Sequence, residues 1–300
     1  MKKIMTIVIA VVLCVALLAS CAAAPAASSA PASSAAASVA ASSVAPSESA
    51  SAPASASEVS SAKIDAIKKA GKLVMMTNAA FPPYEYLGSD NQVAGVDVQL
   101  SQAIADKLGV KLEVTNMEFD SLIPALVAGK GDIVAAGLTI TDERKQSVDF
   151  SDPYADATQL IIIKEDNTNI KTADDLKGKT IGVQLGTTGD IYVSDIEGAT
   201  PKQYKTAIDA GLDLANGKLD AVVIDKLPAQ NIVSSNKGLK IIDTPLTDEH
   251  YAVAVNKGDE GFLALVNGVI KDLISAGTIE KWTEDNAKEA AVASPSPSAS

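Results

Sequence analysis

Arg144 is the only arginine in the 300 residues, and apart from one histidine every other basic side chain is a lysine. A guanidinium carries a planar fork of donors that matches both oxygens of a carboxylate, which a lysine ammonium does not reproduce. Arg144 comes shortly after the apolar run 132–137, and open α/β sheets bind ligands at the carboxyl ends of their strands. A solvated arginine at a helix start is the alternative, and the isolation and position of Arg144 weigh against it.

Asp225 is the second charged candidate, because it ends the apolar run 221–224, which is expected to be a strand. A carboxylate at a strand end can pair with an ammonium group of a ligand. Asp225 also precedes Pro228, so it equally suits the N-cap of a following helix. The sequence leaves these two interpretations even.

Two glycine-containing segments follow expected strands: Gly137-Leu138-Thr139, and 185–189 with Thr187 and Thr188. A glycine lets a ligand approach the backbone, and successive amides at a helix start attract an anion such as a carboxylate. Neither segment is specific alone, because glycine is common where a strand leads into a helix. The second lacks the Walker lysine and the full dinucleotide spacing, so it does not indicate a nucleotide site.

Aromatic residues make up only 4% of the chain, yet Phe81, Tyr84 and Tyr86 fall within six residues after the apolar run 73–77. This crowding is typical of the wall of an apolar pocket. A small cluster that closes the edge of the fold is the alternative, an even choice for Tyr86 and a weaker one for Phe81. Phe119 follows the next expected strand and would face the same side.

The elements that position these residues alternate between apolar strands and amphipathic helices, which predicts an α/β fold with mainly parallel sheets. Strands are expected at 73–77, 111–117 and 132–137, and they complete one βαβαβ lobe by about residue 157. Further strands at 180–183, 221–224 and 239–242 predict a second sheet. We expect 158–164 and 251–256 to cross between the lobes.

Both chain ends differ in composition from this alternating part. A basic start (Lys2, Lys3) and an apolar run at 4–18 that falls short of a bilayer span predict an export signal. The sequence Leu18-Ala19-Ser20-Cys21 resembles the bacterial lipobox, which implies cleavage before Cys21 and a lipid on that residue. An Ala/Ser/Pro-rich stretch to residue 62 and a Ser/Pro-rich end predict a disordered tether and tail.

Composition excludes several classes of function. The only cysteines are Cys14 and Cys21, both in or beside the signal, so we expect no disulfide, and the single histidine cannot build a usual metal site. We expect no cofactor. The formal charge of −12 argues against nucleic acid as a partner.

Six motifs occur in order along the chain, and together they are far more specific than any one of them. The chain resembles the bacterial extracellular solute-binding proteins of family 3, which bind polar amino acids. The resemblance covers about residues 63–287. The motifs are Thr77-Asn78-Ala79-Ala80-Phe81-Pro82-Pro83-Tyr84-Glu85, Gly95-Val96-Asp97-Val98, Phe119-Asp120-Ser121-Leu122-Ile123-Pro124-Ala125-Leu126, the segment 136–145, Asp149-Phe150-Ser151-Asp152-Pro153-Tyr154, and Leu176-Lys177-Gly178-Lys179 before Gly186-Thr187-Thr188.

The resemblance implies a two-lobed periplasmic-binding-protein fold of type II that closes on its ligand, with two hinge strands. The expected organisation is a lipoprotein-type signal peptide at 1–20, a tether at 21–62, the first lobe at 63–158, a hinge at 159–163, the second lobe at 164–250, a hinge at 251–256, helices of the first lobe at 257–288, and a disordered tail at 289–300.

The resemblance also implies the roles of individual residues. The α-carboxylate of the ligand would be held by Arg144 and by the backbone amides of Thr139 and Thr188. Thr187 belongs to the same segment as Thr188. Asp225, the Thr139 hydroxyl and the Gly137 carbonyl would hold its α-ammonium. The remaining members of the implied site are two aromatic walls, Phe81 and Phe119, and two amides at the far end, Asn78 and Gln184.

The implied function is capture of a free L-amino acid outside the cytoplasm and delivery to the permease subunits of an ABC transporter. We expect a monomeric, non-enzymatic lipoprotein, anchored through Cys21 to the outer face of the cell membrane. Asn78 stands where several cation-binding members carry aspartate, which favours a neutral polar ligand, while Glu85 nearby keeps a basic one possible. The alternatives are a secreted cyclohexadienyl dehydratase on the same fold, which acts on prephenate or arogenate, and a ligand-sensing subunit.

Overall fold

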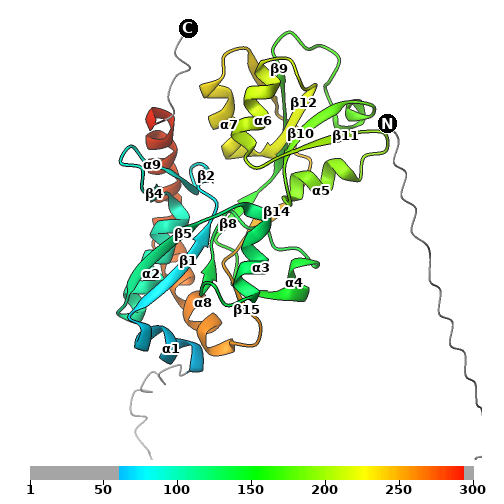
Figure 1. The fold of residues 1–300 in the computed structure, drawn as a ribbon. Coiled ribbons are helices and arrows are strands. Elements are labelled where there is room, and N and C mark those ends of the chain that lie inside the picture. The colour runs from blue at the N-terminus through cyan, green and yellow to red at the C-terminus, as the bar shows by residue number, and fades with distance from the viewer. Residues whose placement is uncertain (1–60, 294–300) are drawn as a thin grey trace, which may run out of the picture. The chain divides into compact units, whose positions relative to one another are not determined.

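The computed structural model describes residues 61–293 (Figure 1). The expected signal peptide, the lipidation site at Cys21 and the expected tether up to residue 60, together with residues 294–300, lie outside the described residues. The first described helix, α1, spans Ala62–Ala70, and the Ser61 hydroxyl caps it by accepting a hydrogen bond from the Ile64 amide at 3.1 Å. Within residues 61–293, no single helix has the length and apolar composition to cross a bilayer; two consecutive helices, 260–275 and 278–291, meet that test only as a pair bent by 76°.

The first five-stranded sheet has the order β5-β1-β6-β15-β7. Met75 and Met76 are consecutive in β1 and therefore point to opposite faces. Met75 joins the apolar cluster that includes Leu100 and Phe262, whereas Met76 packs in a second cluster with Leu122. Helices thus cover both faces. The strands and helices of this lobe are β1 (Lys72–Thr77), α2 (Val96–Leu108), β5 (Lys111–Asn116), η1 (Phe119–Ser121), α3 (Leu122–Val127), β6 (Ile133–Val134), α4 (Arg144–Ser147), β7 (Val148–Phe150), β15 (Ala254–Asn256), α8 (Glu260–Ser275) and α9 (Thr278–Ala293).

The second five-stranded sheet repeats this plan with the order β11-β10-β12-β9-β13. Its consecutive residues Val222 and Val223 again divide between two apolar clusters, one with Leu214 and Ile232 and the other with Val193. The elements of this lobe are β9 (Gln159–Lys164), η2 (Ala173–Leu176), β10 (Thr180–Gln184), α5 (Thr188–Ser194), β11 (Thr200–Tyr204), α6 (Ala207–Ala215), β12 (Ala221–Asp225), α7 (Lys226–Ser235) and β13 (Leu239–Ile242).

A short two-stranded ribbon joins the lobes. β8 (Ala155–Ala157) pairs antiparallel with β14 (Glu249–Tyr251), and Figure 1 shows both between the two large sheets. The two-lobed α/β fold with two connecting strands is therefore confirmed. Both ribbon strands begin before the ranges expected as hinges, 159–163 and 251–256, and share only Tyr251 with them. The apolar residues of these two ranges lie inside the large sheets, in β9 and in the stretch that ends in β15.

Both large sheets are mainly parallel, as expected, and each contains one strand that runs against the other four. β1 is parallel to β5 and β6, but β15 is antiparallel to β6 and β7. In the second sheet, β10 is parallel to β11 and β12, but β9 is antiparallel to β12 and β13. The strands that break the pattern, β15 and β9, are those that follow each crossing of the ribbon. They enter their sheet from the opposite lobe and so run against the strands already there.

The end of the chain returns to the first lobe. α8 packs against α1 and α2, and α9 packs against α2, α8 and also α7 of the second lobe (Figure 1, orange and red). α9 runs to Ala293, five residues beyond the expected boundary at 288. A small meander precedes α2, and it consists of β2 (Ala80–Phe81), β3 (Glu85–Leu87) and β4 (Val93–Ala94).

Candidate functional site

The polar residues selected from the sequence are buried where strands from both lobes end. Asn78 follows β1, Gln184 ends β10 and Asp225 ends β12, and each is less than 8% exposed. Arg144 and Thr139 follow β6 and are also buried. Buried polar groups need partners, and the structure supplies many of these partners from the opposite lobe or the ribbon.

Arg144 is 9% exposed and touches both lobes, which rules out the simple solvated arginine. Its Nη1 donates to the Thr139 carbonyl at 2.6 Å, and its Nη2 donates to the Gly186 carbonyl of the second lobe at 3.1 Å. The guanidinium lies over the Phe119 ring, with its carbon 5.5 Å from the ring centroid. Burial lowers the pKa of Arg144 to about 10, against the opposing effect of nearby carboxylates, so the group keeps its charge at neutral pH.

Asp225 precedes α7, as the N-cap interpretation required, but its side chain makes no capping hydrogen bond. The carboxylate instead accepts from Gln159 Nε2 at 2.7 Å and from the Tyr251 hydroxyl at 2.5 Å. Burial, and secondly the charge of Glu249, raise the pKa of Asp225 to about 7. The carboxyl is therefore directed away from the helix start and is poised to change charge near neutral pH.

Glu249 was missed by the sequence analysis. It lies in the ribbon strand β14 and is 6% exposed. Its carboxylate accepts hydrogen bonds from the hydroxyls of Thr139 and Thr188, at 2.7 and 2.8 Å, and from the Thr247 hydroxyl at 2.8 Å. Its contacts to Thr139 and Thr188 span 110 and 61 residues, so no local pattern distinguishes it from an exposed glutamate at a strand start.

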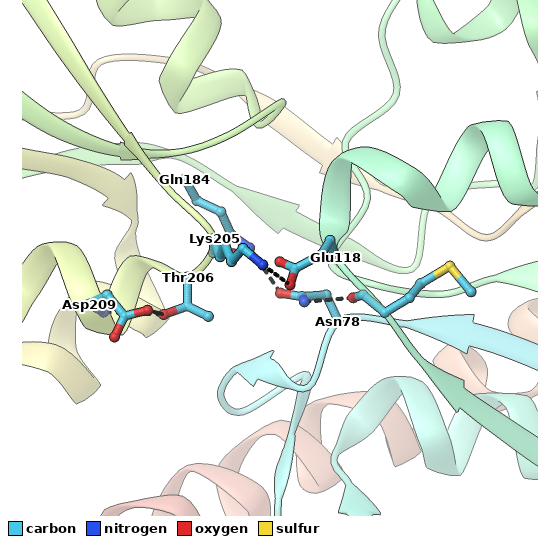
Figure 2. A network of polar contacts seen from close by, with 7 residues as sticks. Asn78, Glu118, Gln184, Lys205, Thr206 and Asp209 are labelled. Atoms are coloured by element: carbon cyan, nitrogen blue, oxygen red, sulfur yellow. Dashed lines mark hydrogen bonds and ion pairs between the residues drawn. The ribbon is translucent and has the colours of Figure 1, made fainter.

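The far end of the site is closed by a chain of contacts between the lobes (Figure 2). Asn78 Nδ2 donates to the Met117 carbonyl at 2.7 Å, and Gln184 Nε2 donates to Asn78 Oδ1 at 2.9 Å and to the Lys205 carbonyl at 3.1 Å. Beside them, Lys205 Nζ pairs with Glu118 Oε1 at 3.1 Å. Asn78 and Gln184 are thus adjacent, on facing lobes.

The aromatic candidates divide between the two charged ends. The Phe81 ring packs near Tyr84 and Tyr251, with centroids 6.2 and 6.3 Å away, and Tyr251 is the partner of Asp225. Phe119 lies beside Arg144. A Cβ at Gly137, where φ is +50°, would approach the Phe81 ring to 2.7 Å, so glycine is required for this packing.

Three residues have environments that limit the roles open to them. Tyr86 donates to Asn286 of α9 at 3.1 Å and serves the packing of the lobe. The Thr187 hydroxyl caps α5, accepting from the Asp190 amide and donating to the Gln184 carbonyl. Glu85 is 0% exposed, and burial, together with the charge of Asp97, raises its pKa well above the usual range. The raised pKa disfavours the ionised carboxylate, so Glu85 is a poor partner for a basic ligand.

Pockets lie beside both charged ends. One is lined by Phe119, Arg144 and Gly186, and another by Tyr84, Asp225 and Tyr251. Within residues 61–293, no three His, Cys, Asp or Glu side chains are grouped so as to hold a metal ion. The arrangement brings one buried cation and two buried carboxyl groups to the junction of the lobes.

Comparison with known proteins agrees with this architecture. The model of the bacterial extracellular solute-binding proteins, family 3, matches residues 73–287. A probable histidine-binding protein of Neisseria gonorrhoeae is 40% identical over 212 residues, which cover 68% of this chain and 79% of that protein. The arginine-binding extracellular protein ArtP of Bacillus subtilis is 36% identical over 216 residues, covering 70% and 84%.

Solved structures give the same result. A mutant of ArgBP from T. maritima superposes with a TM-score of 0.72 at 42% identity and covers 74% of this chain and 98% of its own. The amino acid ABC transporter substrate-binding protein AbpA from Streptococcus pneumoniae, bound to L-arginine, superposes with a TM-score of 0.73 at 33% identity, covering 75% and 98%.

Proposed function

The chain belongs to the bacterial extracellular solute-binding proteins, family 3, and we propose that it captures a free L-amino acid with a basic side chain between its lobes for an ABC importer. One observation carries the proposal: a guanidinium on the first lobe and a carboxylate on the second are both buried where the lobes meet. Such a pair is complementary to the two charged groups of one amino acid. A ligand that contacts both lobes favours the closed state.

Within this proposal, Arg144 and the backbone amides of Thr139 and Thr188 bind the α-carboxylate. Asp225, the Thr139 hydroxyl and the Gly137 carbonyl bind the α-ammonium. Phe81 and Phe119 flank the side chain, and Asn78 and Gln184 lie at its far end. Thr187 contributes by capping α5, the helix that begins with Thr188.

The charges favour a basic side chain over the neutral one that Asn78 alone indicated. Arg144, Asp225 and Glu249 sum to −1 when both carboxyls are ionised, and a ligand of net charge +1 balances them. The relatives bear names that refer to histidine and arginine, which supports this choice. The cationic end would lie toward Asn78, next to the paired Glu118.

The cellular setting is part of the proposal. In this proposal the domain is exported and is anchored by a lipid on Cys21 at the outer face of the cell membrane, where it meets external solutes. It would act there as a monomer with permease subunits. The negative formal charge of −12 repels anionic ligands at long range.

A thermal-shift panel of L-amino acids on protein that has been unfolded and refolded tests this function. At a hundredfold excess over Kd, the cognate ligand should stabilise the fold by about 2.7 kcal/mol, or about 3 °C or more. Arg144→Ala should abolish the shift for every amino acid. Lys145→Ala is the matched control, because this neighbouring side chain is exposed and pairs only with Asp142 in the described structure, at 3.6 Å. A protein that no amino acid stabilises would overturn the proposal.

The dehydratase alternative requires an acidic carboxyl with a raised pKa that reaches the substrate. Both Glu85 and Asp225 have a raised pKa, but Glu85 is fully buried, and Asp225 is the proposed partner of the ligand's ammonium. We therefore propose binding without chemistry. Turnover of prephenate or arogenate by the purified protein would contradict this.

A further inference from the structure

The carboxylate of Glu249, a residue of the ribbon, accepts hydrogen bonds from side chains of both lobes. Thr139 follows β6 of the first lobe, Thr188 is the first residue of α5 in the second, and both hydroxyls donate to the same oxygen, Oε2. Thr247 donates to the other oxygen, Oε1. If the lobes part, at least one of the two bonds to Oε2 must break.

The carboxylate also decides which way the threonine hydroxyls point. An ionised glutamate only accepts, whereas a hydroxyl has one proton and two lone pairs. Thr139 and Thr188 must therefore turn their protons to Glu249, which leaves their lone pairs for other donors. Thr188 uses this capacity in the structure, because its oxygen accepts from Gln159 Nε2 at 3.2 Å.

Gln159 extends the network to the second carboxylate. Its Nε2 donates to Asp225 at 2.7 Å as well as to Thr188. Glu249 and Asp225 are thus linked through two polar side chains, and Thr139 remains as the hydroxyl with acceptor capacity that is proposed to face the ligand. An ammonium is a pure donor, so a hydroxyl held as an acceptor suits it.

We propose that Glu249 is a positioning residue, which holds the Thr139 hydroxyl as an acceptor for the ligand's α-ammonium and fastens the two lobes in the same set of hydrogen bonds. The inference rests on the proposed function. It adds to that site a residue of the ribbon that acts through Thr139 and does not itself contact the amino acid.

A double-mutant cycle with L-arginine, measured by isothermal titration calorimetry, tests the inference. Glu249→Gln keeps the shape but replaces one acceptor with an amide donor, and Thr139→Val removes the hydroxyl. Each should weaken binding about tenfold or more, because each removes hydrogen bonding to a charged group. If Glu249 acts through Thr139, the double variant should be no weaker than the weaker single variant. Additive losses, or unchanged binding by Glu249→Gln, would overturn the inference.

Asp248→Asn is the matched control, because it removes the same charge from the neighbouring exposed residue. It should bind L-arginine within about threefold of the wild type. A loss like that of Glu249→Gln would show a general charge effect and overturn the inference.

A second measurement covers the case in which Glu249→Gln does not fold. Thr139→Val should weaken L-arginine but leave 5-guanidinopentanoate, which lacks the α-ammonium, within about threefold. Equal losses for both compounds would overturn the inference while leaving amino-acid capture intact. Wild-type protein that binds no amino acid would instead overturn the proposed function, and this inference with it.

Discussion

Binding should depend on pH through Asp225. This carboxyl is buried in the described structure, and burial, together with the charge of Glu249, raises its pKa to about 7. An ammonium pairs with the ionised form, so a ligand that binds below pH 7 must first displace a proton. A bound ammonium should lower the pKa of Asp225 from its raised value, and affinity should therefore increase as pH rises.

The magnitude follows from that pKa. At about pH 5.5 only about 3% of a group with a pKa of about 7 is ionised, against about 90% at about pH 8. The Kd should be about 30-fold higher at the lower pH, which corresponds to about 2 kcal/mol. The stability of the unliganded fold should show the reverse trend with pH. Since the folded pKa lies above that of the unfolded chain, the contribution of Asp225 to stability is full below about pH 4 and is lost as pH rises through about 7.

Isothermal titration calorimetry with L-arginine across this range measures the effect, because both cationic groups of this ligand keep their charge below about pH 8. The calorimeter also reports the proton released at acid pH. Asp225→Asn should bind weakly and with a much smaller dependence on pH. A wild-type Kd that stays within about threefold from pH 5.5 to 8 would refute the reasoning.

Three further substitutions probe other parts of the structure. Arg144→Lys keeps the charge but loses the planar fork, and should weaken the ligand about tenfold or more in the thermal-shift assay; full affinity would show that charge alone suffices. Glu118→Gln breaks the exposed pair with Lys205 across the lobes and should weaken binding by about fivefold or less at low salt and not at 1 M salt; a loss that salt does not change would contradict this role. Gly95→Ala places a Cβ 2.1 Å from the Tyr84 carbonyl at a φ of +127° and should destabilise the domain by about 1–3 kcal/mol in urea unfolding; an unchanged midpoint would contradict the strain.

The sequence predicted the features that local pattern and motif order determine. Arg144 follows one expected strand and Asp225 ends another, and these positions predicted a binding site at the strand ends. Both side chains are buried at the junction of the lobes. The sequence left two alternatives for each residue, and only tertiary contacts separate them. Asp225 illustrates this, because it holds the N-cap position while its side chain is directed to Gln159 and Tyr251.

Other features depend on contacts that no local pattern encodes. The apolar runs 159–163 and 251–256 indicated crossings, but continuous apolar residues mark strands inside a sheet, while the true ribbon strand β8 is partly exposed. Glu85 looked like a possible partner for a basic ligand because it is close to Asn78 in sequence. In the fold it is fully buried beside Asp97, and burial, followed by the charge of Asp97, raises its pKa.

The electrostatics of the unliganded site connect ligand capture with proton uptake. Arg144, Asp225 and Glu249 carry a net charge of −1 when both carboxyls are ionised. Ionised Asp225 carries a free-energy cost, because burial, and secondly the charge of Glu249, raise its pKa. A proton relieves it in acid, and a cationic amino acid relieves it at neutral pH, so the two compete for one carboxylate. Glu249 increases this competition by its charge, yet it holds the hydroxyls of both lobes. Glu249 thus raises the free energy of the empty site and at the same time orients its hydroxyls for the ligand. A neutral amino acid leaves the excess negative charge in place, so it should bind less tightly than a basic one.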